Sequence, residues 1–211
     1  MNARLVACPV GFHDLPNDKR EPYDPLRSKV HHDRITRYRI AGMSKVKLYP
    51  HSEKFATIFK REKDLISSAI GKCEIHHIGS TAVPELGGKG IVDMMIALDS
   101  WKEEKDVIKR LRKAGFHHIH PKEKGQIFLS RIRGTKYCDT HLHIVKKGSR
   151  PYKEYLAFRD YLRAHRAEAK RYMNLKRHWL KRAEGARRRY TASKEDYVRD
   201  VLKRCRQERY L

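Results

Sequence analysis

The sequence predicts an α/β protein in which a mixed, twisted sheet is flanked by helices and followed by a C-terminal helical part. Two apolar runs, over residues 74–79 and 91–98, flank a glycine-rich loop, and this pattern is typical of two buried strands joined by a turn. Apolar residues recur at helical spacing on both sides of these runs. Beyond residue 148 the pattern is helical.

We expect one domain preceded by a tail, because 211 residues are enough for one domain with a sizeable core. Residues 1–43 contain four prolines and scattered charges without sustained periodicity, which predicts an irregular, disordered tail. Residues 44–211 then form the domain. Within it we expect an α/β core over 44–148 and a basic helical part over 149–211.

The first helix of the core is expected from Ser52, which is placed to cap its start, to Gly71, which ends it. After the two strands, residues 101–114 repeat the helical pattern and stop at Gly115. This segment therefore predicts a crossover helix that returns the chain to the sheet.

The second half of the sheet is expected to consist of hairpins. Short apolar runs over 116–120, 126–132 and 138–145 predict three strands, joined around 121–125 and around Gly134. The C-terminal part predicts three helices. Their expected ranges are 152–164, 167–183 and 194–206, with Ser193 capping the last helix and Asp196 completing a capping box.

Composition limits the partners and the compartment. Lys and Arg number 49 against 25 Asp and Glu, which gives a net charge of +24 and a surface that attracts polyanions such as nucleic acid or a phosphorylated small molecule. The four cysteines are far apart, so neither a zinc site nor a disulfide framework is indicated. No apolar run approaches the roughly 18 residues of a membrane span. We therefore expect a cytoplasmic protein with no membrane partner.

Asp93 is the one charged residue in the second apolar run. An ionised carboxylate in a buried strand is unfavourable unless something pairs with it. One interpretation is an internal partner, either backbone amides or Lys89 in the preceding loop. The other is a carboxylate that awaits a metal ion or a substrate.

The turn before this strand carries Gly79 and Ser80, small residues that let a phosphate approach backbone amides. Enzymes that transfer nucleotidyl groups use a Gly-Ser pair to hold the triphosphate and carboxylates on the following strand to bind Mg²⁺. Asp93 follows Ser80 by 13 residues, as such a site requires. The second carboxylate is expected two positions later, where this chain has Met95.

A second polar group comprises Asp139, His141 and His143, which alternate along a predicted strand and so project from one face. They are candidate metal ligands or an acid/base set, although a same-face pair of histidines is often structural. Lys89 is able to reach a phosphate, and the alternatives are a solvated loop lysine or a counter-ion for Asp93. The aromatic residues among the basic C-terminal helices either stack with the bases of single-stranded nucleic acid or pack into the core.

Three segments, HIGSTAVPELGGKGIVDMMIAL, THLHIVKKGS and LAFRDYLRAHRAEAKRYMNLKRHWL, resemble the GrpB family in order and spacing over residues 44–206. The family resembles small nucleotidyltransferase-fold proteins, so the resemblance implies that fold and a nucleotide site. Its motif positions fall on Gly79, Ser80, Thr81, Lys89, Asp93, His141 and His143. The family's usual proline after the lysine is Gly90 here, which loosens the entry to the strand.

The expected function is binding of a nucleoside triphosphate with a divalent metal, Mg²⁺, at Asp93, with His141 or His143 replacing the missing carboxylate. A nucleotidyl group would then be transferred to an unknown acceptor by in-line attack on the α-phosphate. The alternative is a non-catalytic module that binds RNA or a nucleotide and retains the fold without the chemistry.

Overall fold

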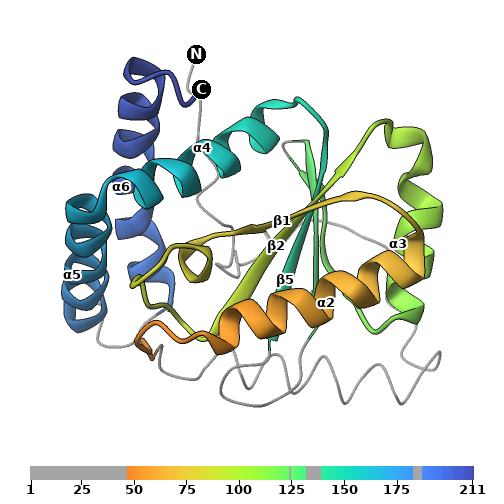
Figure 1. Cartoon of the computed structure of the whole chain (residues 1–211), viewed down its shortest axis with the longest axis horizontal. Coiled ribbons are helices and arrows are strands. Elements are labelled where there is room, and N and C mark those ends of the chain that lie inside the picture. Colours follow the sequence, from red (N-terminus) through yellow and green to blue (C-terminus); the bar gives the residue numbers. More distant parts are fainter. Residues whose placement is uncertain (1–46, 124, 132–138, 183–186) are drawn as a thin grey trace, which may run out of the picture.

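The computed structural model describes residues 47–123, 125–131, 139–182 and 187–211 (Figure 1). The tail expected over 1–43 lies outside the described residues. A five-stranded sheet with the strand order β1-β2-β5-β4-β3 forms the centre. The strands are β1 (Glu74–Ile78), β2 (Ile91–Leu98), β3 (His117–Glu123), β4 (Gln126–Arg131) and β5 (Asp139–Lys146). β2 and β5 are parallel and the other neighbours are antiparallel, so the predicted mixed sheet is confirmed.

The described α-helices are α2 (Lys54–Ile70), α3 (Glu104–Lys113), α4 (Arg150–Ala164), α5 (Arg166–Arg182) and α6 (Arg187–Gln207). Two short 3₁₀ segments, η1 (Ser80–Ala82) and η2 (Trp101–Glu103), follow β1 and β2. Figure 1 shows α4, α5 and α6 gathered at one side of the sheet and α3 at the other. The expected α/β core and helical C-terminal part are thus both present. No helix among the described residues is long and apolar enough to cross a membrane.

One face of the sheet carries the main core. Helical spacing of Phe55, Ile58 and Ile66 gives α2 an apolar stripe, and the helix ends at Gly71, whose φ of 86° favours glycine. This stripe packs with α3 against alternate residues of β2 and β5, among them the fully buried Met94. Burying each such side chain stabilises the fold by about 1.5–3 kcal/mol.

The opposite face of the sheet is smaller and more polar. Side chains alternate along strands, so Asp93 and Met95 of β2 lie on this face together with His141 and His143 of β5, which pair with them in register. α4 covers the apolar part of the face through contacts of Tyr155 and other residues with Ile78, Met95 and Val145. The polar residues therefore lie between the sheet and the helical part.

The helical part packs around its own apolar cluster, which includes Tyr172 and Val201. The loop between β1 and β2 enters this cluster through Val83 and Leu86, each 1% exposed. The buried ammonium of Lys176 on α5 also donates a hydrogen bond to the Gly87 carbonyl of the same loop. The glycine-rich loop is therefore held from both sides, by the sheet and by the helices.

Two local predictions were wrong. α6 begins at Arg187, so Ser193 lies within the helix and is not its cap, because the preceding run contains arginine and alanine, which favour helix as much as the capping signal favours a start. β3 continues to Glu123, which leaves a shorter connection to β4 than the expected 121–125. The hairpin expected around Gly134 lies outside the described residues.

The Glu74 carboxylate ties α4 to the edge strand β1. It accepts hydrogen bonds from the Tyr152 hydroxyl (2.5 Å) and from His76 Nε2 (2.6 Å), and it pairs with Lys147 Nζ (2.9 Å). The bonds from Tyr152 and Lys147 lower its pKa from the ordinary 4.5 to about 2. Because the folded pKa is depressed, the stabilisation is present above pH 4.5 and is lost as the pH falls toward 2.

We predict that Glu74→Gln lowers the free energy of unfolding at pH 7 by about 1.5–3 kcal/mol, the range for hydrogen bonds to a charged group. The variant should also lose less stability than the wild type between pH 4.5 and 2. Urea unfolding of both proteins across this interval measures both effects. Parallel pH profiles would contradict this role for Glu74.

Candidate functional site

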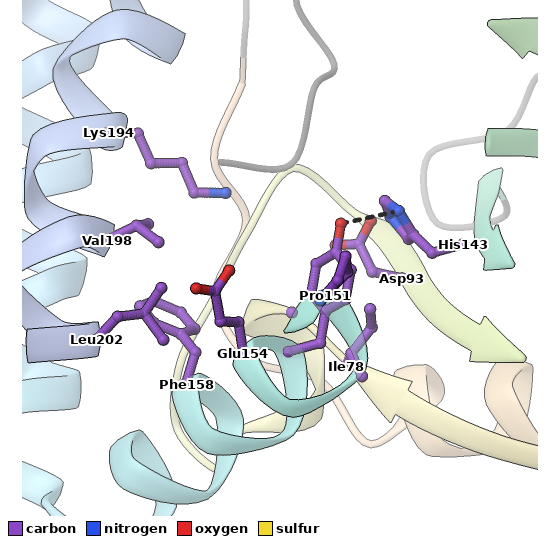
Figure 2. Close-up of a pocket in the computed structure, with 11 residues that line it drawn as sticks. Ile78, Asp93, His143, Pro151, Glu154, Phe158, Lys194, Val198 and Leu202 are labelled. Carbon is purple, nitrogen blue, oxygen red and sulfur yellow. Dashed lines mark hydrogen bonds between the residues drawn. The ribbon is translucent and has the colours of Figure 1, made fainter. Parts of the chain in front are cut away.

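A pocket lies between the polar face of the sheet, α4 and α6, and it encloses about 650 Å³ including the space at its mouth. Figure 2 shows Asp93 and His143 on one side and Phe158, Val198 and Leu202 on the other. The lining residues are Ile78, Gly79, Asp93, His143, Pro151, Glu154, Tyr155, Phe158, Lys194, Val198 and Leu202. A mostly apolar hollow with a few convergent polar groups is the usual form of a small-molecule site.

Asp93 is the acid that the sequence singles out, and its side chain is 19% exposed. The Nδ1–H of His141 on the neighbouring strand donates to Asp93 Oδ1 across 3.2 Å. Burial alone raises the pKa of Asp93, but the hydrogen bond from His141 and the nearby charge of Lys194 outweigh it and hold the pKa below 3.8. Asp93 is therefore an ionised carboxylate, and His141 is one internal partner for it.

Gly79 is pressed against this carboxylate. A Cβ atom at position 79 would lie 2.5 Å from Asp93 Oδ2, and the backbone has φ 69° and ψ −169°, a conformation that essentially only glycine adopts. Gly88 is similarly close to Ser80, since a Cβ there would lie 2.6 Å from Ser80 Oγ. The close approach of neighbouring atoms therefore explains why glycine is found at both positions. At Gly79 it also places the turn after β1 in contact with the Asp93 carboxylate of β2.

The other residues predicted to bind a nucleotide are placed differently. Thr81 is 3% exposed, and its hydroxyl lies 3.0 Å from His77 Nε2. His77 in turn stacks on Phe59 of α2, on the opposite face of the sheet. Among the described residues that line the pocket, Gly79 is present but Ser80, Thr81 and Lys89 are not. Their role in binding stays a prediction.

His143 lies beside Asp93 in a fully buried position. Its Nδ1 is 3.1 Å from the Tyr155 hydroxyl and 3.4 Å from Gln126 Oε1, while that hydroxyl donates to Gln126 Oε1 across 2.8 Å. The Tyr155 hydroxyl therefore links the His143 ring to Gln126. Burial lowers the pKa of His143 to about 4, so the ring is neutral at pH 7.

The side chains of the described residues do not form a metal site by themselves. Within the described residues, no group of three His, Cys, Asp or Glu side chains is placed to hold a metal. Nδ1 of His141 faces Asp93, and Nδ1 of His143 faces Tyr155 and Gln126. The expected position of a second carboxylate on the strand holds Met95, which is fully buried against Ile78. Asp93 fits a Mg²⁺ whose other ligands are water and substrate phosphates, which is how Mg²⁺ is commonly bound.

Three polar or aromatic lining residues were not singled out from the sequence: Glu154 and Phe158 on α4 and Lys194 on α6. Each belongs to an amphipathic helix in which similar residues recur, so no local pattern distinguishes it. Their common position follows from the packing of α4 and α6.

The mixed sheet, with a Gly-Ser turn after β1 and an acid on β2, has the strand, turn and strand arrangement that the sequence predicts. The model of the family described as "GrpB protein" matches residues 45–204, and the chain belongs to this family. It is 33% identical over 161 residues to the "Glutamate-rich protein GrpB" of Alkalihalophilus pseudofirmus, covering 74% of this chain and 92% of the relative.

The structure is similar to a crystal structure of the conserved protein GrpB from Enterococcus faecalis, with a TM-score of 0.70 and 21% identity. The match covers 78% of this chain and all of that one, and it supports the fold. A weaker likeness, with a TM-score of 0.47 and 14% identity, is to the Cid1 poly(U) polymerase bound to MgATP, covering 72% and 50% of the two chains.

We predict that His143 makes the protein less stable in mild acid. Its folded pKa of about 4 lies below the ordinary 6.5, so the unfolded chain takes up a proton first as the pH falls. Between pH 7 and pH 5 this effect removes about 2 kcal/mol of stability. Replacing His143 with Gln should shrink the loss by that amount in urea unfolding, whatever its effect at pH 7. An unchanged loss would show that His143 is not buried in the neutral form.

Proposed function

We propose that the pocket binds a nucleoside triphosphate with its phosphates against the Gly79-Ser80 turn and beside Asp93. The close approach of Gly79 to the Asp93 carboxylate carries the proposal, because it brings half-buried backbone that lines the pocket next to an ionised acid. Asp93 fills the space that a side chain at position 79 would occupy, so a phosphate reaches the backbone amides of the turn from the pocket that Gly79 lines. The acid beside it would repel that phosphate unless a cation lies between them.

Mg²⁺ is the cation that we propose, with Asp93 as its protein ligand. When bound, it neutralises charge on the phosphates and on the oxygen at which a bond is broken. The hydrogen bond from His141 holds the Asp93 carboxylate in one orientation. Lys194, which lines the same pocket from α6, adds a positive charge on the other side (Figure 2).

The apolar wall supports a nucleotide over a simple phosphate. Phe158, Val198 and Leu202 face the pocket from α4 and α6. An aromatic ring and aliphatic side chains offer a nucleobase a surface for stacking and burial. If the protein is an enzyme, the reaction is transfer of a nucleotidyl group from this ligand to an acceptor. Such a ligand fits the cytoplasmic location expected from the sequence.

The proposal is tested by thermal unfolding with each of the four ribonucleoside triphosphates, with and without Mg²⁺. A ligand at 100 times its dissociation constant adds about 2.7 kcal/mol of apparent stability. We expect stabilisation by at least one nucleotide, dependent on Mg²⁺, in the wild type. Asp93→Asn should abolish the Mg²⁺-dependent part, because the amide is a poor ligand for Mg²⁺.

Asp106→Asn on α3 is the matched control, since its exposed carboxylate pairs only with Arg110 in the described structure. It changes the net charge equally and should leave the nucleotide response intact. The readout is the shift caused by the nucleotide and not the melting temperature itself, because Asp93→Asn also weakens the bond with His141. No stabilisation of the wild type, or an equal shift in both variants, would overturn the proposal.

RNA binding by the helical part is a second candidate function, favoured by the surface of α5. Lys170, Arg177 and Lys181 are exposed and lie at i, i+7 and i+11, so they share one face of the helix. No carboxylate pairs with them in the described part of the chain. A row of cations on one helix face suits the phosphates of a single strand.

Replacing Lys170, Arg177 and Lys181 with Gln should weaken binding of a single-stranded RNA and lower the slope of log affinity against log salt by about 2, as expected for three lost phosphate contacts. Replacing the exposed Lys105, Lys109 and Lys113 of α3 is the control with the same change in net charge. Fluorescence anisotropy at several salt concentrations measures both. Equal effects of the two triple variants would indicate only general attraction to a basic protein.

A further inference from the structure

Glu154 brings a second carboxylate to the pocket, from α4 and not from the sheet. Its side chain is only 13% exposed, and Figure 2 shows the carboxylate directed into the space between Asp93 and the apolar wall. The strand position at which a second acid was expected holds the buried Met95. The pocket therefore contains two acids, but they come from different parts of the fold.

Only one oxygen of Glu154 has partners in the described structure. Arg150 Nε donates to Glu154 Oε1 across 2.7 Å, and Arg206 Nη2 lies 3.5 Å from the same oxygen. Both arginines are about half exposed, at 55% and 49%, so they approach from the rim. Oε2 accepts no hydrogen bond from any described residue. This oxygen is not one of the described polar atoms that are buried without a partner, so it is open to the pocket, where a ligand hydroxyl can donate to it.

The position of Glu154 identifies the part of the ligand that it faces. In the proposed complex the nucleobase lies on Phe158, Val198 and Leu202, and the phosphates lie at Gly79 and Asp93. The sugar then lies between the two, where the Glu154 carboxylate points (Figure 2). The two arginines offset the negative charge of Glu154, so that it does not repel the phosphates.

We infer that Glu154 accepts a hydrogen bond from a ribose hydroxyl, so that the pocket selects ribonucleotides over deoxyribonucleotides. The inference rests on the proposed nucleotide site and adds the sugar to it. A site that hydrogen-bonds a substrate hydroxyl rejects an analogue without that hydroxyl, because the carboxylate oxygen is then left unpaired.

The experiment measures dissociation constants by calorimetry on the full chain with Mg²⁺. It uses the ribonucleoside triphosphate that stabilises the protein most, together with its 2′-deoxy and 3′-deoxy analogues. For the wild type we expect at least one analogue to bind roughly 10- to 100-fold more weakly, as the loss of a hydrogen bond to a charged group implies. Equal affinity for all three sugars would overturn the inference and leave the nucleotide site standing.

Glu154→Ala should bring the ratio between ribose and deoxyribose affinities close to one. The ratio is the decisive quantity, because removing a negative charge changes the affinity for every triphosphate alike. Glu154→Gln should give an intermediate ratio, since the amide oxygen still accepts a weaker hydrogen bond. A ratio unchanged by Glu154→Ala would show that another group reads the sugar, and it would overturn the assignment.

Asp160→Ala is the matched control. Asp160 lies on the same helix, also pairs with two arginines, Arg159 and Arg163, and does not line the pocket. This variant should keep the wild-type ratio, and circular dichroism should show that all variants are folded. If no nucleotide binds the wild type under any condition, the proposed function fails together with this inference. That result differs clearly from nucleotide binding without sugar discrimination.

Discussion

The ionised carboxylate of Asp93, held in the middle of an apolar strand, is the constraint on which the site depends. A charge there is tolerated only with a partner, and the parallel pairing of β2 with β5 supplies His141 directly opposite. The same carboxylate lies against the backbone of Gly79, which explains why no side chain is compatible with that position. The turn, the acid and the histidine thus form one unit.

The helical part completes this unit and is not an appendage to it. Val83 and Leu86 of the loop after β1 are buried in the helical cluster, and Lys176 binds the Gly87 carbonyl from α5. Burial and the nearby charges of Lys194 and Lys89 hold the pKa of Lys176 well below its ordinary value. Lys194 and Lys89 therefore lie near Lys176 and the loop that it binds, so an anionic ligand there would offset their positive charge.

The sequence predicted those features that depend on local pattern. The bounds of β2, the end of α2 at Gly71 and the shared face of His141 and His143 follow from periodicity and glycine chemistry, and all are confirmed. The start of α6 was missed because a capping signal at Ser193 competed with a run of good helix formers. Glu154 was not foreseeable, since its place in the pocket depends on how α4 packs against the sheet.

In the proposed function, Asp93 and the Gly79 turn together receive the phosphates of a nucleotide. The most direct measurement is a crystal structure of the full chain with Mn²⁺ and a non-hydrolysable analogue of the nucleoside triphosphate that stabilises it most. We expect anomalous scattering from Mn²⁺ at the Asp93 carboxylate and phosphates beside Gly79. Phosphates bound elsewhere, for example along the exposed cations of α5, with no metal at Asp93, would contradict it.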